Sequence, residues 1–296
     1  MSKLNTPRHR VVPPRALNYS YYYRAEQQSA LKEPVRQPLT ETKSKHTRTR
    51  THRPTLIVVA LLLIGITVIS FVSDARSNQA NKTAVKGAQT IGNLTTSDPK
   101  SINVVINKSH PLSPKNYAPA DLTTPNVPMR ANISEDESKV SKQIAPDLEL
   151  LISAAANNGI QLELESGYRS YAFQVNLYNY YVSAQGQETA DEQSARPGYS
   201  EHQTGFAVDL GSSTDTSCNV QLCFGNTAEG NWLAANAYKY GFIVRYSAAD
   251  QALTGYEPEA WHFRYVGQTL AKTLKDKNIT TLEEYFNISG GTVYKN

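Results

Sequence analysis

Two histidines and two carboxylates stand at spacings that suit a metal site. His202 and Asp209 lie in the run from Ser200 to Asp209, and His262 follows Glu259 by three residues. Two histidines and one aspartate can hold a zinc ion and leave a fourth position for water, the ligand count of a catalytic site rather than a closed structural one. Glu259 could accept a proton from that water. The pattern predicts zinc-dependent hydrolysis.

Four segments occur in the order found in bacterial VanY-like carboxypeptidases. They are residues 166–170 (Ser-Gly-Tyr-Arg-Ser), 194–198 (Ser-Ala-Arg-Pro-Gly), 200–209 (the Ser-x-His-x-x-Gly-x-Ala-x-Asp run) and 261–267 (Trp-His-Phe-Arg-Tyr-Val-Gly). Residues 105–114 resemble the segment that opens the catalytic domain of that family, and the resemblance covers roughly residues 102–275. It implies a zinc D,D- or L,D-carboxypeptidase that trims the stem peptides of peptidoglycan.

One departure from the family pattern is visible beside the second histidine. The family usually has Glu-Pro-Trp-His, whereas this chain has Ala260 between Glu259 and Trp261. The three-residue offset of the glutamate from His262 is kept, so the departure bears on the stiffness of the loop more than on activity.

The resemblance assigns further residues to the site. Arg169 matches the family arginine that holds the substrate carbonyl oxygen as it becomes an oxyanion, with a structural salt bridge as the alternative. Ser200 and Gln174 match positions near the bound peptide, and Tyr168 and Trp261 are expected to shape the pocket.

Two other glutamates are left out of the predicted site. Glu257 lacks the three-residue offset from His262. Glu201 is adjacent to His202, and successive side chains of an extended chain point to opposite faces. We therefore expect Glu201 to point away from the metal.

The periodicity of the region 101–296 predicts an α+β domain, a small antiparallel sheet flanked by helices. The resemblance implies the LAS/hedgehog-like zinc peptidase fold. We expect a helix after a capping box at Ser134 and Glu137, kinked or restarted at Pro146 and ending near residue 158. The other expected helices cover about residues 172–183 and a stretch capped by Thr227; the expected strands are 160–164, 206–210, 242–246 and 260–266, with loops at 186–200 and 211–226.

Both cysteines, Cys218 and Cys223, lie in the expected loop 211–226. A zinc pair is the competing interpretation, but no second Cys/His pair accompanies them. Outside the membrane, a disulfide that closes this short loop is favoured.

An uncharged apolar run precedes the domain. Residues 56–72 carry no charge, and with Thr55 and Ser73 the run has the length of a short membrane span. A buried core helix is disfavoured because the run has no polar face, and a cleaved signal peptide because about fifty residues precede it. The sequence predicts a single transmembrane helix at 55–73, followed by a flexible spacer at 74–100.

The first 54 residues are basic, with 12 Lys/Arg against 3 Asp/Glu, and rich in proline and tyrosine. They show no helical or strand periodicity and are expected to be disordered. A topology signal that touches anionic lipid is favoured over an arm for a partner or for nucleic acid, so no nucleic-acid partner is expected. The positive-inside rule places this tail in the cytoplasm and the domain 101–296 outside the cell membrane.

Three functions follow for that domain. The first is a membrane-anchored D,D-carboxypeptidase that removes the terminal D-alanine of peptidoglycan peptides. An L,D-carboxypeptidase or an endopeptidase stays open, because stereochemical choice depends on the shape of the pocket. A non-catalytic zinc-binding wall module is the alternative from another class, since hedgehog signalling domains resemble this fold. The presence of both Glu259 and Arg169 favours the enzyme.

Overall fold

A four-stranded antiparallel sheet organises residues 95–295, the part of the chain that this computed structural model describes. The predicted tail 1–54 and the predicted transmembrane segment 55–73 lie outside these residues, as does most of the spacer 74–100. Among the helices of residues 95–295, none has both the length and the apolar composition needed to cross a membrane. Thr96 accepts a backbone hydrogen bond from Val105, so the described structure includes the last residues of the predicted spacer.

The strand order of the sheet is β3-β4-β6-β5. Its members are β3 (Leu162–Ser166), β4 (Ala207–Ser212), β5 (Phe242–Tyr246) and β6 (Glu259–Tyr265), and each neighbouring pair is antiparallel. A separate two-stranded ladder joins β1 (Leu122–Thr123) to β2 (Val140–Ser141). The strands that carry Asp209 and His262, β4 and β6, are therefore the two inner strands.

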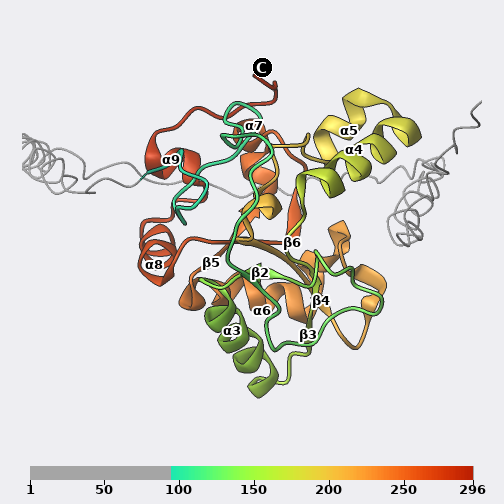
Figure 1. The fold of residues 1–296 in the computed structure, drawn as a ribbon. Coiled ribbons are helices and arrows are strands. Elements are labelled where there is room, and N and C mark those ends of the chain that lie inside the picture. Colours follow the sequence, from blue (N-terminus) through green and yellow to red (C-terminus); the bar gives the residue numbers. More distant parts are fainter. Residues whose placement is uncertain (1–94, 296) are drawn as a thin grey trace, which may run out of the picture. The chain divides into compact units, whose positions relative to one another are not determined.

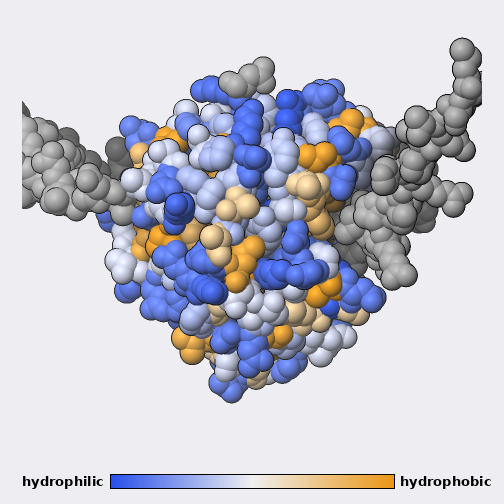
Figure 2. Space-filling model, in the orientation of Figure 1, coloured by the Kyte–Doolittle hydropathy of each residue, from blue (hydrophilic) through white to orange (hydrophobic). Residues whose placement is uncertain are grey.

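Helices surround this sheet, as predicted for an α+β domain. They are α3 (Ala145–Asn157), α4 (Tyr171–Gln185), α5 (Gln187–Gln193), α6 (Ala228–Asn236), α7 (Gln251–Thr254), α8 (Gln268–Lys277) and α9 (Leu282–Phe286). Leu151 of α3 and Leu233 of α6 belong to the same core cluster as the strands, and in Figure 1 α4 and α5 lie together at the upper right, away from α3 and α6. On the face shown in Figure 2, hydrophobic residues lie in small groups among hydrophilic ones.

The main core lies against one face of the sheet. Val208 and Leu210 of β4 and Phe263 of β6 are fully buried there, together with Leu151 of α3 and Leu233 of α6. Side chains alternate between the two faces of a strand. The residues between these core positions on β4 and β6 consequently face the other side, as the alternation of the sequence predicts.

Two details of the predicted helices are corrected. The first helix begins at Ala145, with Pro146 in its first turn, where proline removes no helical hydrogen bond. Glu137 does donate its backbone N–H to Ser134 Oγ (3.2 Å), but these residues form a turn, and Val140 lies in β2. The predicted loop 186–200 also contains α5, a short polar helix whose composition shows little periodicity.

Cys218 and Cys223 form a disulfide within the loop between β4 and α6. Asn219 fastens the same loop to the end of β4. Its Oδ1 accepts a hydrogen bond from the backbone N–H of Ser212 (2.8 Å), and its Nδ2 donates to Ser212 O (2.8 Å). The loop is thus held by the disulfide and by the amide side chain of Asn219, which bonds to both backbone polar groups of Ser212.

Candidate active site

The sheet register brings the predicted aspartate and the second predicted histidine together. Asp209 of β4 pairs directly with His262 of β6. Directly opposed residues of an antiparallel pair have their Cβ atoms within about 5.5 Å on one face. The two side chains therefore meet although 52 residues separate them.

His202 reaches the same point from a tight turn. Residues Glu201–Thr204 form a 3₁₀ turn, which ends at Gly205 with φ of 74°. A side chain there would be strained by this left-handed backbone, and its Cβ would lie 2.9 Å from Ser141 N. The glycine of the Ser-x-His-x-x-Gly run is thus required by the turn that aims His202 at Asp209.

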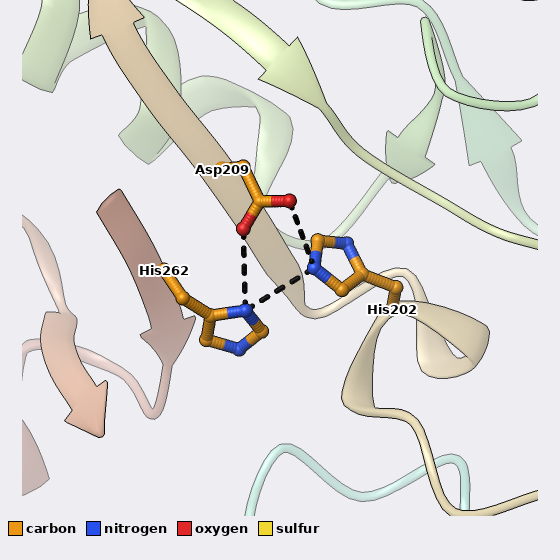
Figure 3. A group of neighbouring side chains, drawn as sticks. All are labelled: His202, Asp209 and His262. Carbon is orange, nitrogen blue, oxygen red and sulfur yellow. Dashed lines mark hydrogen bonds and ion pairs between the residues drawn. The ribbon is translucent and has the colours of Figure 1, made fainter. Parts of the chain in front are cut away.

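The three side chains form a buried triangle (Figure 3). His202 Nε2 lies 3.2 Å from His262 Nδ1. The two carboxylate oxygens of Asp209 lie 3.3 Å from His202 Nε2 and 3.2 Å from His262 Nδ1. Each residue is at most 4% exposed. The three predicted ligands are therefore brought together by the fold.

This triangle fits zinc. Zinc binds histidine nitrogen and carboxylate oxygen at about 2.0–2.2 Å. The edge of a tetrahedron is about 1.6 times its bond length, which gives donor separations of roughly 3.2–3.5 Å for such bonds. The two histidine nitrogens lie 3.2 Å apart, and one ligand atom from each of the three residues lies within 4.8 Å of the others.

The orientation of His202 is set by a backbone carbonyl. Its Nδ1 donates a hydrogen bond to Gly167 O (2.6 Å), which leaves Nε2 to face the triangle. Burial lowers the pKa of His202 to about 4, so the ring is neutral near neutral pH. A neutral imidazole with its lone pair on Nε2 is the form that binds a metal.

His262 lies between two carboxylates. Its Nδ1 faces Asp209, and its Nε2 lies 3.3 Å from Glu201 Oε2. Burial opposes a charge on the ring, but the hydrogen bonds to Asp209 and Glu201 prevail and raise the pKa of His262 to about 9. Burial likewise opposes ionisation of Asp209, yet the two histidines hold its pKa well below the usual range.

Glu201 was missed by the sequence analysis. We expected it to point away from the metal on the assumption of an extended chain, whereas it lies in the 3₁₀ turn and is 1% exposed. Burial disfavours its charge, but Arg245 and Arg264 keep its pKa well below the usual range. The signal that could have identified the turn is the glycine at position 205.

Glu259 begins β6 beside the triangle. Its Oε2 lies 3.5 Å from His262 Nδ1, and its side chain is 20% exposed. The pKa of Glu259 is raised to about 7, mainly by burial; His262 and Arg169 lower it, and Asp209 and Glu257 add to the rise. A carboxyl with a pKa near 7 is suited to accept and return a proton at neutral pH.

Arg169 also lies at the triangle. Its Nη1 is 3.4 Å from Asp209 Oδ2, and its backbone N–H donates to His202 O (3.2 Å). The salt bridge that the sequence analysis gave as an alternative is therefore present. The role of Arg169 toward a developing oxyanion stays a prediction.

The four predicted substrate contacts differ in their placement. Gln174 is buried on α4, and its Nε2 donates to Ala195 O (2.8 Å), so it holds the loop before Ser200. Ser200 is buried at the start of the 3₁₀ turn, and Tyr168 is buried directly before Arg169. Trp261 packs against the main core, on the opposite face of β6 from His262.

Two histidines and an aspartate around one point, with a glutamate of raised pKa beside them, are the arrangement of a metallopeptidase. The comparisons with known proteins agree with this class. The family model of VanY, D-alanyl-D-alanine carboxypeptidase, matches residues 137–268. YodJ of Bacillus subtilis (strain 168), provisionally named a carboxypeptidase, is 42% identical over 202 residues, which are 68% of this chain and 71% of that protein.

This chain aligns with almost the whole length of a second relative. VanXYC of Enterococcus gallinarum, a bifunctional D-Ala-D-Ala dipeptidase and carboxypeptidase, is 33% identical over 64% of this chain and 95% of its own length. The chain therefore belongs to the VanY family of D-alanyl-D-alanine carboxypeptidases, and it is a peptidase.

Solved structures show the same fold. The LD-carboxypeptidase LdcB has a TM-score of 0.60 and 41% identity, covering 64% of this chain and 88% of its own. A glutamate-to-alanine variant of the D,D-pentapeptidase VanY, in complex with zinc, has a TM-score of 0.52 and 30% identity, covering 62% and 98%. The expected LAS-type fold of the domain is thus confirmed.

Proposed function

We propose that this protein is a zinc carboxypeptidase that removes the terminal D-alanine from peptidoglycan stem peptides. The observation that carries the proposal is the buried triangle of His202, Asp209 and His262, with Glu259 Oε2 3.5 Å from His262 Nδ1. A zinc ion bound there would polarise the scissile carbonyl and lower the pKa of its water to about 7. No other group of histidine, cysteine and acidic residues within residues 95–295 offers three ligands in this way.

The residues of the chain have distinct tasks in this reaction. Glu259 accepts the proton of the attacking water and returns it to the departing amine, for which its pKa of about 7 is suited. Arg169, already 3.4 Å from Asp209, supplies a guanidinium for the negative charge that develops on the carbonyl oxygen. A binding module would need neither group, so their presence together supports an enzyme.

The family name supports a D,D-carboxypeptidase, which would cut before the last residue of a pentapeptide. An L,D-carboxypeptidase, which would cut a tetrapeptide, is the second candidate. It is favoured by the greater identity to LdcB (41%) and to the L,D-carboxypeptidase DacB of the pneumococcus (36%, TM-score 0.51). Both candidates release D-alanine and use the same residues.

The location we propose follows from the sequence. The uncharged run 55–73 would anchor the chain in the cell membrane, with the basic residues 1–54 in the cytoplasm. The domain 101–296 would then lie on the outer side of the cell membrane, where it would bind its peptide substrate.

Incubation of the full-length protein with defined muropeptides tests the function. Pentapeptide, tetrapeptide and cross-linked substrates are supplied separately, and mass spectrometry identifies what is released. D-alanine from the pentapeptide supports the D,D-activity, and D-alanine from the tetrapeptide supports the L,D-activity. Separation of the cross-linked chains would indicate an endopeptidase, and no release from any substrate would favour the non-catalytic wall module.

A further inference from the structure

The second ring nitrogen of His262 has a buried carboxylate partner. Nδ1 of His262 faces His202 and Asp209, and the other nitrogen points away from them (Figure 3). That nitrogen, Nε2, lies 3.3 Å from Glu201 Oε2. We propose that Glu201 is a positioning residue for the zinc ligand His262: it fixes the ring rotation and the tautomer that present Nδ1 to the metal. The inference rests on the zinc site of the proposed function.

The hydrogen-bonding capacity of a carboxylate gives the tautomer. A carboxylate accepts hydrogen bonds and has none to donate. His262 must therefore carry a hydrogen on Nε2 to bond with Glu201. Nδ1, which faces Asp209, is then the nitrogen that would give up its proton and offer its lone pair when zinc binds. Partners of this kind orient the histidine ligands of metal sites and raise their basicity. His202 has the opposite arrangement, since its Nδ1 donates to Gly167 O and its Nε2 faces the triangle.

Glu201 is itself held in place by two arginines. Arg245 Nε donates to Glu201 Oε1 (2.9 Å), and Arg264 Nη1 donates to the same oxygen (2.7 Å). The side chains of all three residues are 0% exposed. Because both guanidinium groups bind Oε1, the other oxygen, Oε2, is directed at His262.

The arginines are anchored in turn to distant parts of the chain. Arg245 makes two further hydrogen bonds to Glu283 of α9 (2.7 and 3.0 Å), and Asn107 donates to Glu283 as well (2.9 Å). Arg264 Nη2 donates to the carbonyl of Val104 (2.7 Å). Residues 104–107 and α9 thus hold the group that orients the predicted metal ligand His262.

A matched pair of variants separates positioning from general support of the fold. Glu201→Gln removes the charge that faces His262, whereas Glu283→Gln removes a buried charge from the same network without touching His262. Zinc affinity of the full-length protein in detergent is measured by competition with a chromophoric chelator. We expect Glu201→Gln to weaken zinc binding by about 10–100-fold, the usual effect of removing such a partner. Glu283→Gln leaves Glu201 Oε2 beside His262 Nε2, so we expect it to weaken zinc binding clearly less.

Two results would overturn the inference: zinc affinity unchanged in Glu201→Gln, or an equal loss in both variants, which would assign the effect to the fold. If Glu201→Gln does not fold, nitrogen-15 NMR of the zinc-loaded parent decides. His262 should carry its hydrogen on Nε2 and His202 on Nδ1; metal bound to Nε2 of His262 would refute the assignment. A parent protein that binds no zinc would instead overturn the proposed function, and this inference with it.

Discussion

Replacing Glu259 by glutamine tests the central chemical assignment. Glutamine keeps the size of the side chain but cannot accept the proton of the attacking water. The burial that raises the pKa of Glu259 to about 7 matches it to a zinc-bound water, whose pKa is also about 7. General acid–base catalysis contributes about 10²–10⁴-fold. We expect kcat to fall by that factor, which corresponds to about 2.7–5.5 kcal/mol of transition-state free energy.

The same variant should keep the metal and the fold. Glu259 is outside the group of three ligands, so zinc content should equal that of the parent. Burial raises the pKa of Glu259 from 4.5 to about 7. At pH values above 4.5, this side chain therefore lowers the free energy of unfolding of the zinc-free protein. Removing its charge should leave the Tm at neutral pH unchanged or raised.

The assay measures D-alanine release from the preferred muropeptide, alongside zinc content and melting temperature. Glu257→Gln is the matched control: this neighbouring carboxyl is the smallest of the named influences on the pKa of Glu259, so we expect kcat to fall far less than in Glu259→Gln. Hydrolysis by Glu259→Gln at the parental rate would refute the mechanism. Loss of zinc in the same variant would show that Glu259 acts as a ligand.

The remaining predictions concern the metal and the membrane. His202→Ala and His262→Ala should each lose stoichiometric zinc and turnover, since the triangle has three protein ligands; tightly bound zinc in both, measured by elemental analysis, would contradict the ligand assignment. Zinc competes with the proton on His262, whose pKa is raised to about 9. Affinity should therefore fall as pH falls below about 9 and level off above it, and calorimetry in buffers of different ionisation enthalpy should detect proton release at pH 7; affinity independent of pH would contradict this. A reporter fused after Asn296 should be active outside the cytoplasm, because the basic residues precede the apolar run; activity inside would refute the topology.

The sequence was informative where a short pattern determines local geometry. Alternation along β4 placed Asp209 on the face opposite Val208 and Leu210, and the core has these two residues fully buried. Such alternation works because the strand period of two is insensitive to the rest of the fold. The three-residue offset between Glu259 and His262 is odd, so alternation alone would place them on opposite faces of β6. The pairing of β5 with β6 shifts register in this stretch, and Glu259 Oε2 lies 3.5 Å from His262 Nδ1.

Long-range contacts could not be derived in this way. The cross-strand pair of Asp209 and His262 depends on the order β4-β6 within the sheet, and the sequence alone does not specify that order. The salt bridge between Arg169 and Asp209 depends on the neighbouring pair β3-β4. The family resemblance indicated that these residues belong to one site. Periodicity indicated only on which face of its strand each side chain lies.

The error about Glu201 has a single physical origin. Alternation holds for an extended chain, but a 3₁₀ turn has three residues per turn, so adjacent side chains lie about 120° apart rather than on opposite faces. Gly205, with its left-handed backbone, ends that turn. As a result, His202 approaches Nδ1 of His262 while the adjacent Glu201 approaches Nε2. One tight turn thus supplies both a predicted metal ligand and the hydrogen-bond partner of another predicted ligand, and the glycine of the motif matters for both.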